Sequence, residues 1–409
     1  MQIDLLQEAE TRETFCILPF NAIQINQYQV LPCCKMSVLE PVQNSWKETF
    51  DRYFANEQLR AMQESFLRSE PPAVCKKCFL GPKQSLYPDQ KLSDFRHSVQ
   101  QGLINPMITA TPTVQFLNIL LTNACNLRCR HCAPGCSSSL DKIWDDELVR
   151  LTGSQKTPLI KSDELINELI SNPKFDDVKS VLLSGGEPLM LKRLAEVAGK
   201  FAERGAEKIG IVTNLSDDPF NFLDYFNELG KDVYATVTVS IDGDRIVHPY
   251  HRNQLDIDAF VANAKKLNSL ENVHVCVMIA VDAINILTFT NLIDFVFELF
   301  DGSIFFQLSI VENAFLHVRV LPQELKQLAL DRLNYYIDNF PHKDKYAANS
   351  AMSRLLQVRQ VLESAIKFGY NRILFDRFIE YLTALDKKYG TSFEEVIPEF
   401  SPFLQQTAS

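Results

Sequence analysis

Three cysteines lie close together in the stretch Cys125–Asn126–Leu127–Arg128–Cys129–Arg130–His131–Cys132. This stretch follows the apolar run 114–121. Its spacing places three thiols on one short loop. Four-iron clusters normally take four cysteines, so three thiols leave one metal coordination position, an open corner, without a protein ligand. An open corner distinguishes catalytic from structural metal sites. The alternatives are a zinc loop or buried thiols, but zinc sites usually show a second C-x2-C pair nearby, and none follows closely here.

The bulk properties are those of a globular chain of two or three domains. It has 409 residues, of which 46% are hydrophobic and 22% charged. No apolar window reaches the ~18 uncharged residues that are needed to cross a membrane, and residues 1–13 contain no signal-peptide core. We therefore expect a cytoplasmic protein with no membrane partner.

The charge and the cysteines narrow the function classes further. A formal net charge of −10 argues against broad nucleic-acid binding. Disulfides are rare in a reducing compartment, yet the chain has ten cysteines, most of them in two clusters. Clustering of this kind favours metal binding over disulfides.

The first segment, 1–113, holds the earlier cysteine cluster. Two short strands are expected at 15–25, with a break at Pro19, and at 29–31, and a helix is expected at 46–67. Thiols separated by a hairpin and a helix can converge on one metal centre, either zinc or iron–sulfur. Adjacent side chains of a strand face opposite ways, so only one of Cys33 and Cys34 is expected to be a ligand. The candidate ligands of this second centre are Cys16, Cys33, Cys34, Cys75 and Cys78.

The central segment, 114–311, alternates strands with amphipathic helices. Continuously apolar strands between helices predict a parallel sheet covered by helices. Six strand–helix units, rather than eight, predict a partial (β/α)6 TIM-like barrel, in which catalytic groups follow the carboxyl ends of the strands. The cysteine loop follows the first strand. The expected strands are 114–121, 178–184, 208–214, 234–241, 273–281 and 303–311, and the expected helices are 163–170, 191–204, 219–229, 256–267 and 286–300.

The last segment, 312–409, is expected to be a helical extension. Helices are predicted at 323–340, 348–368 and 372–385, with a final turn near 393–400. The segment is rich in aromatic residues, which we expect to pack against the barrel. A lid over the substrate or a dimer face is the alternative.

Two further motifs lie at predicted strand ends. Ser184–Gly185–Gly186–Glu187–Pro188 follows the second strand, where two glycines allow close backbone approach to a ligand and Pro188 suits the first position of a helix. Ser240 and Asp242 end the fourth strand on one face, an arrangement that suits the hydroxyls of a ribose. Asn214 ends the third strand and offers an amide to the same pocket.

The three motifs together resemble those of radical S-adenosylmethionine (SAM) enzymes, over about 114–311. The resemblance implies a [4Fe-4S] cluster held by Cys125, Cys129 and Cys132, with SAM on the fourth iron. It implies that Gly185, Gly186 and Glu187 contact the methionine amine, and that Ser240 and Asp242 contact the ribose. One-electron reduction, by a flavodoxin or ferredoxin, then yields a 5′-deoxyadenosyl radical that abstracts a substrate hydrogen.

The first segment resembles the auxiliary-cluster segment of SPASM/twitch radical enzymes. The resemblance rests on Cys16–Ile17–Leu18–Pro19–Phe20, on Val30–Leu31–Pro32–Cys33–Cys34 and on Cys75-x2-Cys78. It implies an auxiliary [4Fe-4S] cluster. Two departures are that the segment precedes the barrel and that Asn26–Gln27–Tyr28–Gln29 replaces the glycine of the hairpin.

Two residues remain to be assigned. Cys276 on the fifth strand is either a buried core residue or a hydrogen donor to a substrate radical, and Arg252 is either in a surface salt bridge or paired with the cofactor carboxylate. By analogy with SPASM/twitch relatives, the expected substrate is a peptide or an amino-acid derivative, modified for example by epimerisation or cross-linking. The alternatives are a sugar or nucleotide metabolite, or a zinc-stabilised interaction protein without enzymatic activity.

Overall fold

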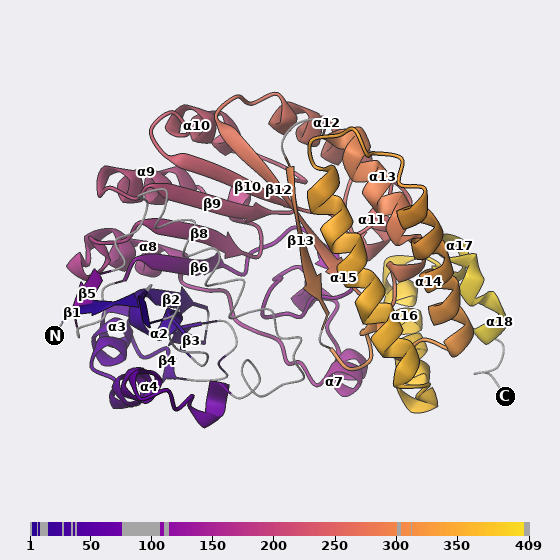
Figure 1. Cartoon of the computed structure of the whole chain (residues 1–409), viewed down its shortest axis with the longest axis horizontal. Helices are drawn as coiled ribbons and strands as arrows, with labels where there is room; N and C mark the ends of the chain where they lie inside the picture. The colour runs from indigo at the N-terminus through magenta and orange to yellow at the C-terminus, as the bar shows by residue number, and fades with distance from the viewer. Residues whose placement is uncertain are drawn as a thin grey trace. The chain divides into compact units, whose positions relative to one another are not determined.

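The computed structural model describes residues 2–5, 7–8, 15–26, 28–33, 36, 39–75, 107–109, 114–300, 304–311 and 313–404 (Figure 1). Cys34 and Cys78 of the expected second metal centre lie outside these residues. The chain forms two compact units. The first comprises residues 1–122, 160–211 and 228–235, and the second comprises 123–159, 212–227 and 236–409.

The first unit contains a mixed sheet in the order β9–β8–β6–β2–β3–β4. β9, β8, β6 and β2 run parallel, and β3 and β4 add an antiparallel edge. β6 alternates buried Leu117, Ile119 and Leu121 with less buried residues, as a strand with helices on one face should. The strands are β2 (Ala22–Ile25), β3 (Gln29–Leu31), β4 (Glu40–Pro41), β6 (Phe116–Thr122), β8 (Ser180–Gly185) and β9 (Lys208–Thr213), with β1 (Gln2–Asp4) paired separately to β5 (Met107–Thr109).

Two expectations for the first segment are wrong. Residues 15–25 are not one strand, because α2 (Leu18–Asn21) occupies the middle, with Pro19 in its first turn, where proline costs no hydrogen bond. Residues 46–67 form two helices, because the Asn56 side chain accepts a hydrogen bond from Leu59 N and so begins a second helix. The helices of this unit are α2, α3 (Trp46–Phe54), α4 (Glu57–Leu67), η1 (Ala73–Cys75), α8 (Ser162–Ser171), η3 (Pro173–Phe175), η4 (Pro188–Met190) and α9 (Leu194–Glu203).

The second unit contains β10 (Tyr234–Ser240, which begins at the unit boundary), β12 (Val273–Val281) and β13 (Ile304–Ile310), in that order. β12 and β13 are parallel. A separate ribbon pairs β7 (Arg128–Cys129) with β11 (Arg252–Asn253). The helices are η2 (Leu140–Lys142), α7 (Asp146–Thr152), α10 (Phe222–Leu229), α11 (Val247–His251), α12 (Ile257–Asn268), η5 (Ile286–Thr288), α13 (Phe289–Leu299), η6 (Val318–Val320), α14 (Gln323–Asp338), α15 (Ala348–Lys367), α16 (Arg372–Tyr389), α17 (Phe393–Val396), η7 (Pro398–Phe400) and α18 (Ser401–Leu404).

The helical extension covers the outer edge of β13. Ser350 of α15 accepts a hydrogen bond from Phe306 N at 3.0 Å, and Arg354 donates to Phe306 O at 2.8 Å. Side chains of α15 therefore satisfy backbone groups that an edge strand would otherwise leave open to another chain. This contact explains physically why the series of strands ends at β13.

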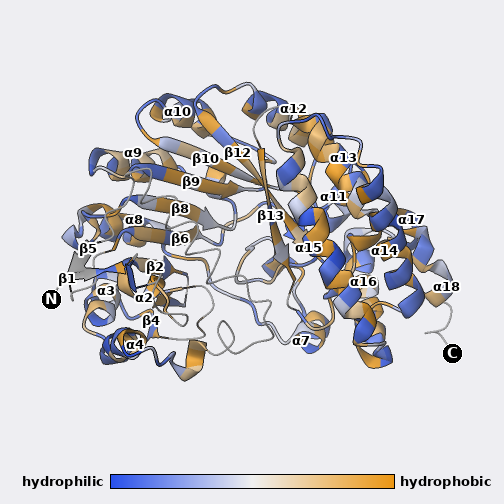
Figure 2. Ribbon diagram, in the orientation of Figure 1, coloured by the Kyte–Doolittle hydropathy of each residue, from blue (hydrophilic) through white to orange (hydrophobic). Residues whose placement is uncertain are grey.

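The predicted fold class is confirmed: a mixed α/β fold with parallel strands, consistent with a partial TIM-like barrel, followed by a helical C-terminal region. Figure 2 shows the apolar residues concentrated along strands such as β8, β9 and β12, while the helices carry one polar side. Within the described residues, no helix has the length and apolar character needed to span a membrane.

Candidate active site

The cysteine loop lies in the second unit and is held by its own hydrogen bonds. Cys129 is buried, and Cys125 and Cys132 are half-buried. Ser137 Oγ donates to Leu127 O and Ser139 Oγ donates to Cys125 O, each at 2.7 Å. The serine run that follows the cysteines thus ties the loop down, a role that the sequence alone did not show.

Cys129 lies opposite Arg252, because β7 and β11 pair in that register. Arg252 Nη1 lies 3.7 Å from Cys129 Sγ, while Nε donates to Asp242 Oδ2 at 2.7 Å. Burial raises the pKa of the Cys129 thiol to about 12, and the positive charge of Arg252 opposes that rise. Metal binding must remove this proton, and the nearby guanidinium assists its loss.

Cys125 is contacted by the amide of Asn214, the residue that ends the third predicted strand. Asn214 Nδ2 lies 3.8 Å from Cys125 Sγ, and Leu127 N lies 3.5 Å from the same sulfur. Asn214 Oδ1 accepts from Ser216 N at 2.9 Å, so the amide NH2 lies on the other side, where it donates to Asn126 Oδ1 at 3.2 Å and also lies near the Cys125 thiol. The structure therefore brings Asn214 to the cysteine loop, as its place at a strand end suggested.

Cys136, four residues after the last cysteine of the loop, hydrogen-bonds to Cys132. This hydrogen bond raises the pKa of Cys132 and lowers the pKa of Cys136 to about 7. Cys136 is exposed. With Cys132 bound to a metal as a thiolate, the Cys136 thiol would be the group able to donate this bond.

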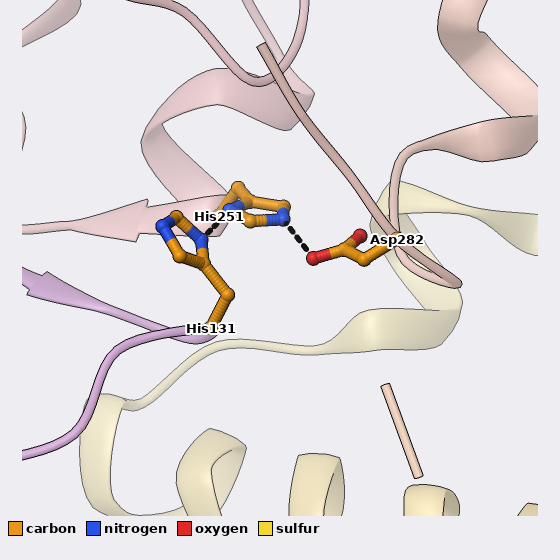
Figure 3. Close-up of side chains that lie close together, drawn as sticks. All are labelled: His131, His251 and Asp282. Carbon is orange, nitrogen blue, oxygen red and sulfur yellow. Dashed lines mark hydrogen bonds and ion pairs between the residues drawn. The ribbon is translucent and has the colours of Figure 1, made fainter. Parts of the chain in front are cut away.

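Two histidines and a carboxylate form a short chain that begins at His131 of the loop (Figure 3). His131 Nδ1 lies 3.1 Å from His251 Nδ1, and His251 Nε2 lies 2.8 Å from Asp282 Oδ2. Burial lowers the pKa of His131 to about 4. Burial also opposes the charge on His251, but the Asp282 carboxylate raises its pKa overall.

Asp242 is completely buried, with its carboxylate held on two sides. Oδ2 accepts from Arg252, and Oδ1 accepts from Ala280 N of β12 at 2.8 Å. Burial alone would raise its pKa, but Arg252 and the nearby histidines hold that pKa well below the usual range. Ser240, two residues earlier, is buried on the same face of β10. Gly243 follows, and a Cβ there would lie 2.6 Å from His248 N.

The Ser184–Pro188 motif lies in the first unit, at the end of β8. Ser184 Oγ donates to Ile119 O at 3.0 Å, and Gly186 N donates to Thr122 O at 2.6 Å. Gly185 has φ +145°, and a Cβ there would lie 2.2 Å from Thr122 O. Buried Glu187 accepts from Leu189 N at 3.0 Å, and Pro188 begins η4 as expected. The motif packs against Thr122, the last residue of β6.

Arg130, inside the cysteine loop, is anchored by the C-terminal helix α16. Its Nη2 lies 2.7 Å from Asp386 Oδ1, and its guanidinium lies 3.7 Å from the centre of the Tyr250 ring. Tyr381 donates to Arg130 O at 2.7 Å, and Tyr389 donates to Arg128 O at 3.2 Å. The helical extension therefore holds the backbone of the loop that carries the thiols.

The three loop sulfurs are less closely gathered than the ligand atoms of a single metal ion would be. Within the described ranges, the side chains whose ligand atoms gather closely enough for one ion are His131, His251 and Asp282, and the loop cysteines are not among them. Zinc–sulfur bonds of about 2.3 Å would draw the sulfurs together. Three more widely spaced thiols, each with a hydrogen-bond partner, suit a polynuclear cluster instead.

The remaining predicted residues are the cysteines of the first unit and Cys276. Cys16, Cys33 and Cys75 are half-buried in the first unit, and because Cys34 and Cys78 lie outside the described residues, the auxiliary centre stays a prediction. Cys276 is buried on β12, opposite Phe305 of β13. Its role as a hydrogen donor also stays a prediction.

Sequence reasoning missed Asp282, the Arg130–Asp386 pair and the contact of Cys136. Asp282 directly follows β12, just as Asp242 follows β10, so its place at a strand end was a usable signal. Asp386 is 256 positions away from Arg130 in the sequence, and no local pattern indicates the pair.

Comparison with known families identifies the class of protein that this fold and loop define. The model of the Radical SAM superfamily matches residues 119–296. This part of the chain belongs to the radical SAM superfamily, which confirms the resemblance found in the sequence, and the domain is an enzyme domain.

Curated relatives match only part of the chain. GTP 3',8-cyclase of Synechocystis sp. is 31% identical over 130 residues, which are 32% of this chain and 34% of that protein. Molybdenum cofactor biosynthesis protein 1 of Dictyostelium discoideum is 29% identical over 177 residues, covering 39% of this chain and 25% of that protein. The chain thus spans about a third or less of the length of these two relatives.

Among solved structures, the crystal structure of Streptococcus suis SuiB bound to precursor peptide SuiA superposes with a TM-score of 0.38 at 14% identity, covering 78% of this chain and 69% of that one.

Proposed function

We propose that the chain is a radical SAM enzyme that binds a [4Fe-4S] cluster through Cys125, Cys129 and Cys132 and abstracts hydrogen from its substrate. The observation that carries the proposal is the loop of three thiols inside the matched segment 119–296. The cluster with SAM supplies, on one-electron reduction, a 5′-deoxyadenosyl radical.

The residues of the chain hold and shield this cofactor. The thiols are fixed by the serine hydrogen bonds and by Arg130. Gly185, Gly186 and Glu187 are proposed for the methionine end of SAM, and Ser240 and Asp242 for the ribose. Asp242 Oδ1 already accepts from Ala280 N, and Oδ2 accepts from Arg252. A ribose hydroxyl would therefore donate to an oxygen that also accepts from one of these groups.

For the substrate, we favour a nucleotide or a related small metabolite over the peptide that the SPASM/twitch resemblance suggested. The support is that curated relatives are GTP 3',8-cyclases. The buried face of β10 also carries the hydroxyls of Thr236, Thr238 and Ser240, which suit a polar small molecule. A flavodoxin or ferredoxin is the proposed electron donor, in the cytoplasm.

Anaerobic reconstitution tests the cluster. The wild-type chain should bind at least about four irons and release 5′-deoxyadenosine from SAM after reduction. Replacing Cys125, Cys129 and Cys132 together by alanine should remove about four irons and abolish that release. Cys276→Ala is the matched control and should keep both. A wild-type chain that binds zinc, or fewer than about four irons, contradicts the proposal.

Two further assays test the substrate class and the auxiliary cluster. Incubation with GTP, other nucleotides or a peptide pool in deuterated form should move deuterium into 5′-deoxyadenosine only from the true substrate class. Deuterium from peptides alone overturns the nucleotide preference. Replacing Cys16, Cys33, Cys75 and Cys78 should halve the iron while SAM cleavage continues, and unchanged iron argues against an auxiliary cluster.

A further inference from the structure

Arg252 is held beside the cysteine loop by contacts within the chain. Its backbone pairs with Cys129 in the β7–β11 ribbon. Its Nε and Nη2 both lie 2.7 Å from Asp242 Oδ2, which leaves Nη1 to lie 3.7 Å from Cys129 Sγ. The side chain is 10% exposed, so little solvent screens its charge from the sulfur.

Asp242 fixes the direction of this guanidinium. The carboxylate is completely buried, and its other oxygen accepts from Ala280 N of β12. The position of Arg252 is thus set by a main-chain group of the sheet and by the ribbon. An arginine held at both ends in this way is a preorganised donor to Cys129 rather than a mobile one available to a ligand.

Asn214 supplies a comparable donor to a second thiol. Ser216 N and Ser216 Oγ both donate to Asn214 Oδ1, at 2.9 and 2.5 Å. The Asn214 amide is therefore oriented with Nδ2 toward the loop, where one hydrogen is donated to Asn126 Oδ1 at 3.2 Å and the other is available to Cys125 Sγ at 3.8 Å. Two of the three thiols receive a side-chain N–H from outside the loop, one from a cation and one from a neutral amide.

We propose that Arg252 and Asn214 are positioning residues that set the reduction potential of the cluster, by donating hydrogen bonds to Cys129 and Cys125. This inference rests on the proposed function. Hydrogen bonds to cluster sulfurs and nearby positive charge stabilise the reduced, more negative cluster and so raise its potential. Arg252 contributes more than Asn214, because hydrogen bonds from ionised donors are roughly twice as strong as those between neutral groups.

The test is a redox titration of the reconstituted cluster without SAM, followed by electron paramagnetic resonance. Arg252→Gln should make the equilibrium constant for reduction at least tenfold less favourable, a shift of about 59 mV to lower potential for one electron. Asn214→Leu should shift it in the same direction by less. Arg332→Gln, which breaks a pair with Glu399, and Asn263→Leu, which loses a hydrogen bond to Leu215 O, are the matched controls. Both should titrate as wild type.

The outcomes separate this inference from the proposed function. A wild-type chain without a reducible cluster contradicts the proposed function and, with it, the inference. A wild-type cluster, with both Arg252→Gln and Asn214→Leu holding full iron at the wild-type potential, overturns the inference alone. If Arg252→Gln does not retain iron, Asn214→Leu decides: a lowered potential supports the inference and an unchanged one overturns it.

Discussion

Gly185 shows how a single position at a strand end constrains the site. Its φ of +145° is a conformation that side-chain-bearing residues avoid, and a Cβ would lie 2.2 Å from Thr122 O. The close approach allows Gly186 N to donate to that carbonyl. The double glycine therefore fixes the motif against the end of β6, immediately before the cysteine loop.

Gly185→Ala should lower the free energy of unfolding by about 3 kcal/mol or more, from backbone strain and the clash together. Gly153→Ala is the control, since Gly153 has φ +75° with open space around it, and should cost only about 1 kcal/mol. Urea denaturation measures both. Equal losses would show that the contact with Thr122 contributes nothing.

His248 makes the free energy of unfolding depend on pH. It is completely buried, its Nδ1 accepts from Asp242 N, and burial together with the charge of Arg252 lowers its pKa to about 3. A histidine whose pKa falls on folding stabilises the protein above the unfolded pKa of about 6.5. That contribution is lost as the pH falls toward the folded pKa. His251, whose pKa is raised, acts in the opposite sense.

His248→Gln should therefore flatten the decline of unfolding free energy between pH 6.5 and 5, by up to about 1.4 kcal/mol per pH unit at the lower end. The quantity to compare is the slope of the unfolding free energy against pH, measured by urea denaturation of the metal-free chain. A wild-type slope in the His248 variant would mean that this histidine is charged in the folded chain.

At the scale of elements, α16 is the support of the cysteine loop. Arg130 is completely buried and lies between the rings of Tyr250 and Tyr389, with Asp386 as its ionic partner. Arg377 of α16 donates to Leu151 O of α7 at 2.7 Å. The same helix thus contacts the loop and the crossover that follows it, as expected of an extension that packs against the barrel.

Asp386→Asn should lower the free energy of unfolding by about 3 kcal/mol, because it leaves the Arg130 charge buried with a neutral partner. The control is Asp376→Asn on the same helix, which breaks an exposed pair with Arg372 at 2.8 Å and should cost less than about 1 kcal/mol. Denaturant titration compares the two. A loss no larger than that of the control would mean that α16 does not anchor the loop.

At the scale of the whole molecule, much of the architecture was predictable. The six strands of the central segment lie within two residues of their expected bounds, because buried parallel strands are continuous apolar runs between helices. The first segment was less predictable. α2 replaced half of an expected strand, because four residues that begin with Leu18–Pro19 are too few for periodicity to separate helix from strand.

The sequence by itself determined the three thiols, the order of the motifs along the chain and the strand ends on which they lie, because spacing and periodicity are local properties. Only the tertiary structure decided that Arg252 faces Cys129, that Asn214 faces Cys125 and that Asp386 receives Arg130. These contacts join positions between 89 and 256 residues apart. A charge or amide that is buried when the core packs must find a hydrogen-bond partner inside the protein. Which groups are buried together depends on the packing of the whole chain.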